Sequence, residues 1–251
     1  MIEERITSRK NPLIQQVRKL LTSRKDRQAA GLFVADGTKL LEEAVKWWEG
    51  LETVILSDGV QVRVPEHVRV VRVPGDVMES ISPMRSPQGA LFLCRLPEES
   101  GWKAQPGMLL LDGIQDPGNL GTILRTADAL EIPVVLLEGC ADPYSHKVVR
   151  SSMGAVFRTG QIVQTTWADV QAKCREQEIP VAVTALSDRA KDIRSVELKN
   201  HAVVTGSEGQ GVRKEILDAA DAELIIPMNQ RCESLNAAVA STIVLWEMAK
   251  I

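Results

Sequence analysis

Cysteine and histidine are rare in this sequence, and none of them stands at a spacing that holds a metal. Four cysteines (Cys94, Cys140, Cys174 and Cys232) and three histidines are spread over 251 residues, without a CxxC, HxH or HExxH pair. Zinc sites built by a protein use such closely spaced pairs, so no metal site is expected. The cysteines are expected to be reduced core or surface residues.

Long apolar runs are also missing. The first residues, MIEERITSRKN, are charged where a signal peptide needs an apolar segment, and no run approaches the roughly 20 residues of a membrane-spanning helix. Hydrophobic residues make up 44% and charged residues 25% of the chain. This balance excludes a disordered tail, a collagen-like repeat and a disulfide scaffold, and it predicts a folded, soluble, cytoplasmic protein.

Aromatic residues are scarce, and positive charge is concentrated at one end. Phe, Trp and Tyr make up 4% of the chain, so aromatic surfaces for stacking nucleic-acid bases are expected to be few. The net charge is −3, yet residues 1–30 hold eight Lys or Arg against three acidic residues. A polyanion would therefore be steered toward the N-terminal end, although a solvated helix face is an equally simple interpretation.

The first part of the chain predicts a small α/β domain. Asn11 and Pro12 are typical of a helix start, and the apolar spacing after them predicts an amphipathic helix over 12–29 with its basic residues outward. Predicted strands and helices then alternate, as 32–36, 38–49, 53–58, 68–74, 76–82 and 90–96. The polar stretch 98–106 predicts a linker between a domain of residues 1–97 and a second of residues 107–251.

The second part alternates strands and helices more regularly. The predicted strands are 108–112, 134–138, 161–163, 181–186, 202–206 and 223–227, and the predicted helices are 119–131, 145–155, 167–178, 212–220 and 234–250. These strands are apolar without polar alternation, which indicates a parallel sheet covered on both faces. Ligands of such sheets bind beyond the carboxyl ends of the strands, so the loops after the strands are the candidate site.

Two of these loops have unusual compositions. The loop over 112–130 is a Gly- and Pro-rich turn with Asn119 as the predicted helix cap. Arg125 lies off the apolar stripe of the following helix and can face a ligand, although an ordinary surface arginine fits as well.

The loop TGSEGQGV (205–212) places three glycines in six residues around Glu208, so that backbone can approach a ligand closely. It matches neither GxGxxG nor a Walker loop, which disfavours a nucleoside triphosphatase.

A third loop places polar side chains at the start of an apolar helix. Glu233, Ser234 and Asn236 lie together there, and helix capping by Ser234 would explain only one of the three. The helix that follows is apolar around most of its circumference. Such a helix is expected to be buried, and a second subunit is the surface predicted to cover it.

Taken together, these motifs resemble those of the SpoU/TrmH family of RNA 2′-O-ribose methyltransferases, in the SPOUT superfamily. The three family motifs are present in order as NLGTILRTADAL, VVTGSEGQGV and IPMNQRCESLN, and DPYSHKVVRSSMGAVFR matches the stretch between the first two. The segments SRKNPLIQQVRKL, FVADGTKLLEEA and PQGALFL resemble the family's substrate-binding domain, which is similar to a small ribosomal protein. The sequence departs from the family pattern at Gln230 and Cys232, where a glycine and a small aliphatic residue are usual.

The resemblance implies an α/β fold with a deep C-terminal trefoil knot, which holds S-adenosylmethionine, and a homodimer packed through the knotted region. The activity that the resemblance implies requires no metal. The catalytic residues implied by the motifs are Asn119, Arg125, Glu208, Ser234 and Asn236. The implied cofactor-binding residues are Thr184, Ala185, Gly206, Ile226, Met228, Ser234 and Leu235.

The resemblance also implies a reaction, methyl transfer from S-adenosylmethionine to a ribose 2′-hydroxyl of RNA. The family assigns the counterpart of Arg125 to activation of that hydroxyl. A guanidinium has a pKa above ~12 and is almost never neutral, so Arg125 is expected to stabilise the developing alkoxide or a neighbouring phosphate instead of acting as a base. Family members with this N-terminal domain often act on ribosomal RNA, which favours 23S rRNA over tRNA. A tRNA 2′-O-methyltransferase, a base methyltransferase and a non-catalytic RNA-binding paralogue are the alternatives.

Overall fold

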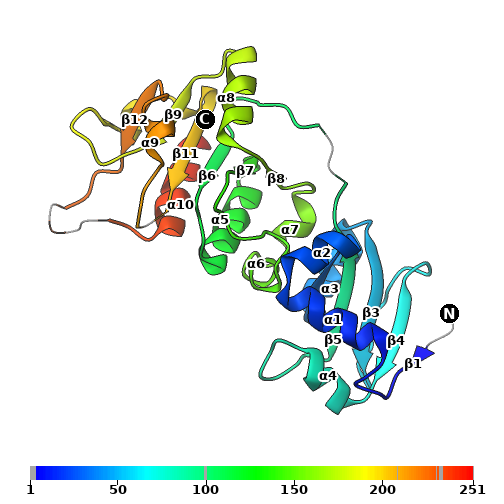
Figure 1. The fold of residues 1–251 in the computed structure, drawn as a ribbon. Coiled ribbons are helices and arrows are strands. Elements are labelled where there is room, and N and C mark those ends of the chain that lie inside the picture. Colours follow the sequence, from blue (N-terminus) through cyan, green and yellow to red (C-terminus); the bar gives the residue numbers. More distant parts are fainter. Residues whose placement is uncertain (1–3, 99–100, 208, 230, 232–233, 251) are drawn as a thin grey trace. The chain divides into compact units, whose positions relative to one another are not determined.

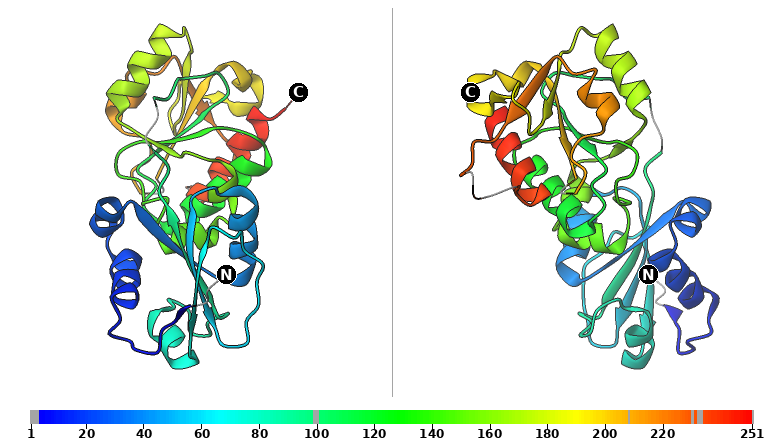
Figure 2. Two further views of the ribbon diagram at one scale, coloured as in Figure 1. Left: turned by 90° about the vertical axis from the view of Figure 1, so that its right-hand side faces the viewer. Right: turned by 60° about the vertical axis from the view of Figure 1, so that its left-hand side comes forward.

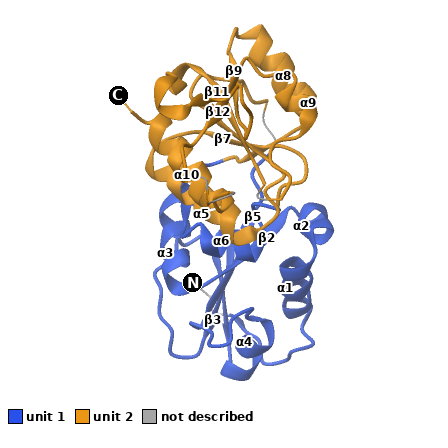
Figure 3. Ribbon diagram, turned by 90° about the vertical axis from the view of Figure 1, so that its left-hand side faces the viewer, with its two compact units in different colours: residues 1–98, 142–160 blue, residues 99–141, 161–251 orange. Residues whose placement is uncertain are grey.

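A computed structural model describes residues 4–98, 101–207, 209–229, 231 and 234–250 of the chain (Figures 1 and 2). The chain divides into two compact units. Unit 1 comprises residues 1–98 and 142–160, and unit 2 comprises residues 99–141 and 161–251 (Figure 3). The second segment of unit 1 lies inside the range predicted for the second domain.

Unit 1 is built around a mixed five-stranded sheet in the order β1-β4-β3-β5-β2. Its strands are β1 (Glu4–Arg5), β2 (Leu32–Asp36), β3 (Leu51–Ser57), β4 (Arg69–Val73) and β5 (Ala90–Arg95). Its helices are α1 (Pro12–Thr22), α2 (Arg24–Ala30), α3 (Thr38–Trp47), α4 (Gly75–Ile81), α6 (His146–Ser151) and α7 (Ala155–Arg158). Strand β5 runs antiparallel to both of its neighbours, whereas β1, β4 and β3 are parallel.

The helix predicted over 12–29 is two helices, and the residue that separates them is Ser23. Asn11 caps α1 as predicted, because its side chain accepts a hydrogen bond from the Leu13 N–H at 2.9 Å. Ser23 is extended, and its hydroxyl accepts from the Asp26 N–H at 3.1 Å, so it ends α1 and begins α2. The prediction that the basic residues all face outward is wrong for Arg27, which is 5% exposed.

Segment 142–160 belongs to unit 1 because its aromatic side chains complete the core there. The Phe33 ring lies 5.2 Å from the Tyr144 ring and 6.2 Å from the Phe157 ring, measured between centroids. The buried Arg27 guanidinium forms an ion pair with Asp142 at 2.6 Å. Aromatic packing of this kind stabilises by more than the buried area alone, so a segment distant in sequence is held in this core.

Unit 2 is built around a seven-stranded sheet in the order β10-β12-β9-β11-β6-β7-β8, and every pair in it is parallel, as the apolar strands predict. The strands are β6 (Leu109–Asp112), β7 (Val134–Leu136), β8 (Val163–Gln164), β9 (Val181–Thr184), β10 (Lys191–Asp192), β11 (Ala202–Gly206) and β12 (Ala222–Ile225). The helices are α5 (Pro117–Ala129), α8 (Trp167–Glu176), α9 (Lys214–Leu217) and α10 (Ala237–Met248), with two 3₁₀ turns, η1 (Ile193–Ser195) and η2 (Leu198–Asn200).

Helices cover both faces of this sheet. Buried side chains of α8 and α9 form one core with Leu110, Val183 and Val204 of the strands. Helices α5 and α10 lie side by side on the other face (Figure 2). The buried hydroxyls of Ser241 on α10 and Thr205 on β11 are 3.1 Å apart and hydrogen-bonded, which fixes α10 against the sheet.

The cysteines in the described part of the chain are free. Cys94 and Cys174 are buried, and Cys140 is half-buried; Cys232 lies outside the described residues. Burial raises the pKa of the Cys140 thiol to about 11. Its Sγ–H therefore stays protonated at neutral pH and donates to the Leu111 carbonyl at 3.2 Å.

No helix in the described residues is long and apolar enough to cross a membrane.

Candidate functional site

A cavity of about 640 Å³ opens at the carboxyl ends of β9, β11 and β12. The loops that follow these strands line it, together with the approach to α10. All seven residues predicted to bind a cofactor lie on its wall, namely Thr184, Ala185, Gly206, Ile226, Met228, Ser234 and Leu235. The tertiary structure thus gathers residues that are up to 51 positions apart in the sequence into one site.

The Gly-rich loop after β11 forms one wall of this cavity and folds back on itself. The Gly211 N–H donates to the Ser207 carbonyl at 2.9 Å, and these two residues form an antiparallel bridge. A Cβ atom at Gly206 would lie 2.1 Å from the Gly211 carbonyl carbon, so the doubled-back shape excludes any side chain there. Gly211 has a φ of +66°, which favours glycine at the return of the loop.

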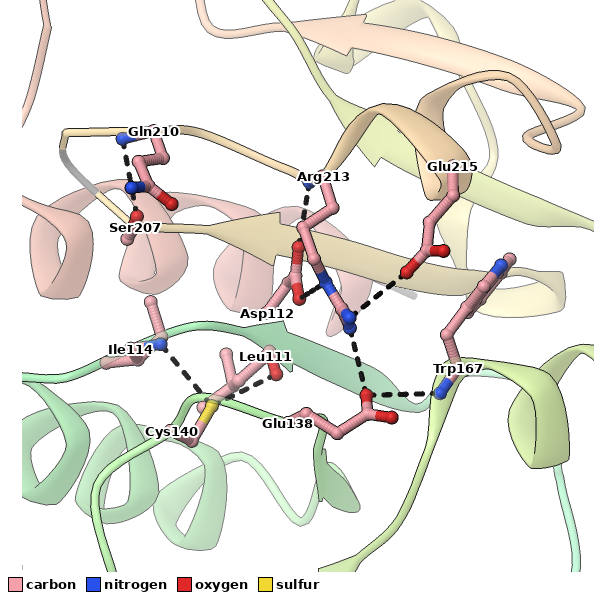
Figure 4. Close-up of polar contacts among 10 residues, drawn as sticks. All are labelled: Leu111, Asp112, Ile114, Glu138, Cys140, Trp167, Ser207, Gln210, Arg213 and Glu215. Carbon is pink, nitrogen blue, oxygen red and sulfur yellow. Dashed lines mark hydrogen bonds and ion pairs between the residues drawn. The ribbon is translucent and has the colours of Figure 1, made fainter.

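Behind this loop lies a cluster of charged residues that the sequence analysis did not single out (Figure 4). The Arg213 Nε donates to Asp112 Oδ1 at 2.7 Å, and the Arg213 backbone N–H donates to Asp112 Oδ2 at 2.8 Å. The Arg213 guanidinium also forms ion pairs with Glu138 and Glu215, both at 3.0 Å. Two sequence signals could have revealed the cluster. Asp112 ends an otherwise apolar strand, where a buried carboxylate needs a partner, and Arg213 lies two residues after the last glycine of the loop.

The electrostatics of the cluster favour its charged form. Burial alone would raise the pKa of the Glu138 carboxyl. Hydrogen bonds from backbone N–H groups and from the Arg213 guanidinium outweigh burial and hold that pKa below its ordinary value. The Asp112 side chain is 2% exposed, and Arg213 donates two hydrogen bonds to it. The cluster is therefore a fixed ion-pair network at the carboxyl ends of β6 and β7.

The first and third motifs meet where α5 and α10 begin. The residue that caps α5 is Asp116, whose side chain accepts from the Asn119 N–H at 2.8 Å, so the prediction that Asn119 is the cap is wrong. Pro117 occupies the first helical position and places the cap before it. Asn236, not Ser234, caps α10, and its Nδ2 donates to Asn119 Oδ1 at 3.1 Å. The two asparagines thus join the starts of the paired helices.

Arg125 is exposed on α5 and is not among the residues that line the large cavity. It borders a second hollow of about 400 Å³ between α5 and α10, together with Thr122, Thr242 and Trp246. Ser234 is on the wall of the large cavity, whereas Asn119 and Asn236 are not. Glu208, the remaining predicted catalytic residue, lies outside the described residues, as do Gln230 and Cys232.

Comparison of the sequence with known protein families identifies the family of this chain. Residues 106–246 match the SpoU rRNA Methylase family. The chain belongs to that family. Residues 11–91 of this SpoU family member match the MRM3-like substrate binding domain. The α/β fold with a parallel sheet is thus that of the SPOUT methyltransferases, as predicted. The trefoil knot stays a prediction.

Several relatives of this SpoU protein match it over nearly its whole length. A 23S rRNA (guanosine(2553)-2′-O)-methyltransferase of Bacillus subtilis is 31% identical over 98% of this chain and 99% of its own. Among solved structures, an AdoMet-bound rRNA methyltransferase from Sinorhizobium meliloti is 30% identical, with a TM-score of 0.85 over 98% of this chain and 97% of its own. A putative RNA methyltransferase of the TrmH family from Porphyromonas gingivalis is 33% identical, with a TM-score of 0.83 over 93% and 95%.

Proposed function

We propose that this protein transfers a methyl group from S-adenosylmethionine to a ribose 2′-hydroxyl of ribosomal RNA, with 23S rRNA favoured. The observation that carries the proposal is the cavity lined by Thr184, Ala185, Gly206, Ile226, Met228, Ser234 and Leu235. Its volume of about 640 Å³ lies in the range of small-molecule sites. At Gly209 and Gly211 on its wall, no described atom lies within 4 Å of the position that a Cβ would take, and this open space suits a cofactor held through backbone groups.

The proposed chemistry divides the work between cofactor and protein. S-adenosylmethionine supplies an activated methyl group when it is bound. The protein residues bind, orient and neutralise charge. Arg125 stabilises the negative charge that develops on the ribose oxygen or on a neighbouring phosphate. Asn119 and Asn236, which hydrogen-bond to each other, orient the ribose beside it, and Ser234 does so from the cavity wall. Glu208 anchors either Arg125 or the motif loop to which Glu208 itself belongs.

A homodimer formed through α10 completes the proposed site. Trp246 and Val239 on this helix are 62% and 49% exposed, which is unusual for large apolar side chains. Trp246 and Arg125 border the same hollow. A second copy of the chain packed on this face would bury both apolar residues and bring Arg125 to the subunit interface, where it serves substrate held by either copy.

RNA binding is proposed for unit 1. Three of its N-terminal bases are already neutralised, because Arg5, Arg9 and Arg27 form ion pairs with Asp58, Asp76 and Asp142. Lys10, Lys19 and Lys25 are exposed, and no ion pair involves them within the described residues. These lysines supply the phosphate contacts that dominate affinity for RNA and weaken with salt. A cytoplasmic location, where ribosomal RNA is available, stays a prediction.

The function is tested by methyl transfer in vitro. The purified protein is incubated with tritiated S-adenosylmethionine and either ribosomal RNA or tRNA. We expect tritium in 23S rRNA, and nucleoside analysis should place the methyl group on the ribose. Labelling of tRNA alone would support the tRNA alternative, and a methylated base would support base methylation. No incorporation into either RNA would favour a non-catalytic RNA-binding protein. Mapping the modified nucleotide in cells with and without the gene would identify the substrate position.

The dimer is tested by placing a charge on the exposed face of α10. We expect Trp246→Glu to be monomeric in light scattering where the natural sequence is dimeric, because a carboxylate cannot be buried there unpaired. Methylation should fall together with the dimer, while binding of S-adenosylmethionine persists. Trp47→Glu is the matched control, since Trp47 is 49% exposed on unit 1. A dimeric Trp246→Glu variant would contradict the proposed interface.

A further inference from the structure

We propose that Arg213 is a positioning residue for the cofactor, because it holds the Gly-rich loop 206–212 in its binding shape from the side away from the cavity. The inference rests on the proposed function, since it assigns a role in binding S-adenosylmethionine. Arg213 itself is absent from the cavity wall, whereas Val212 before it and Lys214 after it belong to that wall. Its effect on the cofactor therefore passes through the loop.

Both ends of the loop are fixed to one residue of the neighbouring strand. Gly206, where the loop leaves β11, is the register partner of Asp112 at the end of β6. Arg213, where the loop ends, donates its backbone N–H and its Nε to the two carboxylate oxygens of that same Asp112. The separation of the two loop ends is thus set by a two-pronged contact with a side chain that is 2% exposed.

The other arm of the guanidinium connects the loop to a third strand. The Arg213 Nη2 donates to Glu138 Oε2 at 3.0 Å, and Glu138 follows β7. The same oxygen accepts the backbone N–H of Trp167, the first residue of α8, at 3.3 Å (Figure 4). The arginine therefore fixes the position of the loop relative to the ends of β6 and β7 and the start of α8, which are rigid elements of unit 2.

The loop needs such an anchor because its described residues make few other contacts that determine its shape. Glycine loses more conformational freedom on ordering than any other residue, and three of the residues from 206 to 211 are glycine. Within the described residues of the loop, the anchoring contacts are the Ser207–Gly211 bridge, the contact from the Gln210 N–H to Ser207 Oγ and the burial of Val212. If the contacts of the Arg213 side chain with Asp112 and Glu138 are removed, the loop can adopt other conformations. S-adenosylmethionine then binds only the fraction of molecules that has the binding conformation, and its apparent affinity falls.

Lysine and arginine differ at such a site. A guanidinium presents its donors in a planar fork that meets Asp112 and Glu138 at once, whereas an ammonium is a single point charge. Arg213→Lys thus keeps the positive charge in the cluster but loses the forked contact with Asp112 and Glu138. An exposed arginine of the same unit, Arg175 in the last turn of α8, provides the matched control as Arg175→Lys.

The experiment measures cofactor binding by calorimetry and methylation kinetics on the full-length protein. For Arg213→Lys we expect the Kd and the KM for S-adenosylmethionine to rise about tenfold or more, with kcat at saturating cofactor within about threefold of the natural sequence. The KM for RNA and the far-ultraviolet circular dichroism should not change. Arg175→Lys should match the natural sequence in every measurement. This split between KM and kcat is not expected of a general loss of stability.

A second variant keeps the test decisive if Arg213→Lys fails to fold. Asp112→Asn preserves the shape of the side chain but leaves one oxygen to accept two N–H groups, so we again expect a tenfold or greater rise in the cofactor Kd. A folded Arg213→Lys or Asp112→Asn variant that binds S-adenosylmethionine as tightly as the natural sequence would overturn the inference. So would a fall in kcat with an unchanged Kd. If the natural sequence itself did not bind S-adenosylmethionine, the proposed function would fail instead, which is a different result.

Discussion

Replacing Arg125 with alanine is expected to leave binding of S-adenosylmethionine intact and to lower the single-turnover rate of methyl transfer by about 100-fold or more. Cofactor binding should persist because Arg125 is not among the residues that line the cavity proposed to hold the cofactor. The second half follows from the proposed role, in which its guanidinium stabilises negative charge on the reacting oxygen. Single-turnover kinetics with excess enzyme and calorimetry with the cofactor alone measure the two halves separately.

Two further variants define what the arginine does. Arg125→Lys should remain slow, because an ammonium keeps the charge but not the two-pronged contact. A nearly full rate for Arg125→Lys would show that bidentate contact is unnecessary. Arg175→Ala is the control for loss of an exposed arginine from a helix of unit 2, and its rate should not change. If Arg125→Ala weakened cofactor binding as much as it slowed transfer, the residue would belong to the cofactor site.

Replacing Gly206 with alanine is expected to weaken binding of S-adenosylmethionine by roughly 10- to 100-fold. The added Cβ would lie 2.1 Å from the Gly211 carbonyl carbon and 2.4 Å from the Val212 nitrogen. Both are backbone atoms that cannot rotate away, so the loop has to open to relieve the clash. Closing it again around a ligand then carries an overpacking cost of about 1–3 kcal/mol, which corresponds to that range of affinity. Calorimetric titration with S-adenosylmethionine measures the loss.

The same loop provides the control. A Cβ at Gly209 would meet no described atom within 4 Å, so Gly209→Ala should bind the cofactor within a few-fold of the natural sequence. Thermal unfolding of both variants separates a local effect on the loop from a loss of fold. Equal weakening by the two substitutions would indicate that the loop requires glycine for flexibility, not for the close approach at Gly206.

Much of unit 2 could be predicted because its strands and helices are local features. The apolar runs that become β6, β9, β11 and β12 are identified within one residue or two of their observed ends. The pattern of a strand followed by a Gly-rich loop also predicts where the loops converge, since parallel strands present their carboxyl ends at one edge. The seven residues that the family resemblance implies for the cofactor lie on one cavity wall at this edge.

Other features required the tertiary structure. Asn119 and Ser234 are reasonable helix caps by residue type, yet Asp116 and Asn236 occupy those positions. Capping depends on which residue leaves helical geometry first, and neighbouring Asp, Asn and Ser compete for it nearly equally. The break of the first predicted helix at Ser23 has the same origin.

The sequence by itself determined the succession of strands and helices, the parallel sheet of unit 2 and the motifs that identify the family, because these follow from local periodicity and composition. Only the tertiary structure decided that residues 142–160 complete the core of unit 1, that Arg213 pairs with Asp112 at the end of the Gly-rich loop, and that Arg125 borders a hollow with Trp246 instead of lining the large cavity. The physical reason is that burial and ion pairing act between residues that are close in space. Residue spacing along the chain carries no information about which distant partner satisfies a buried charge or fills a core.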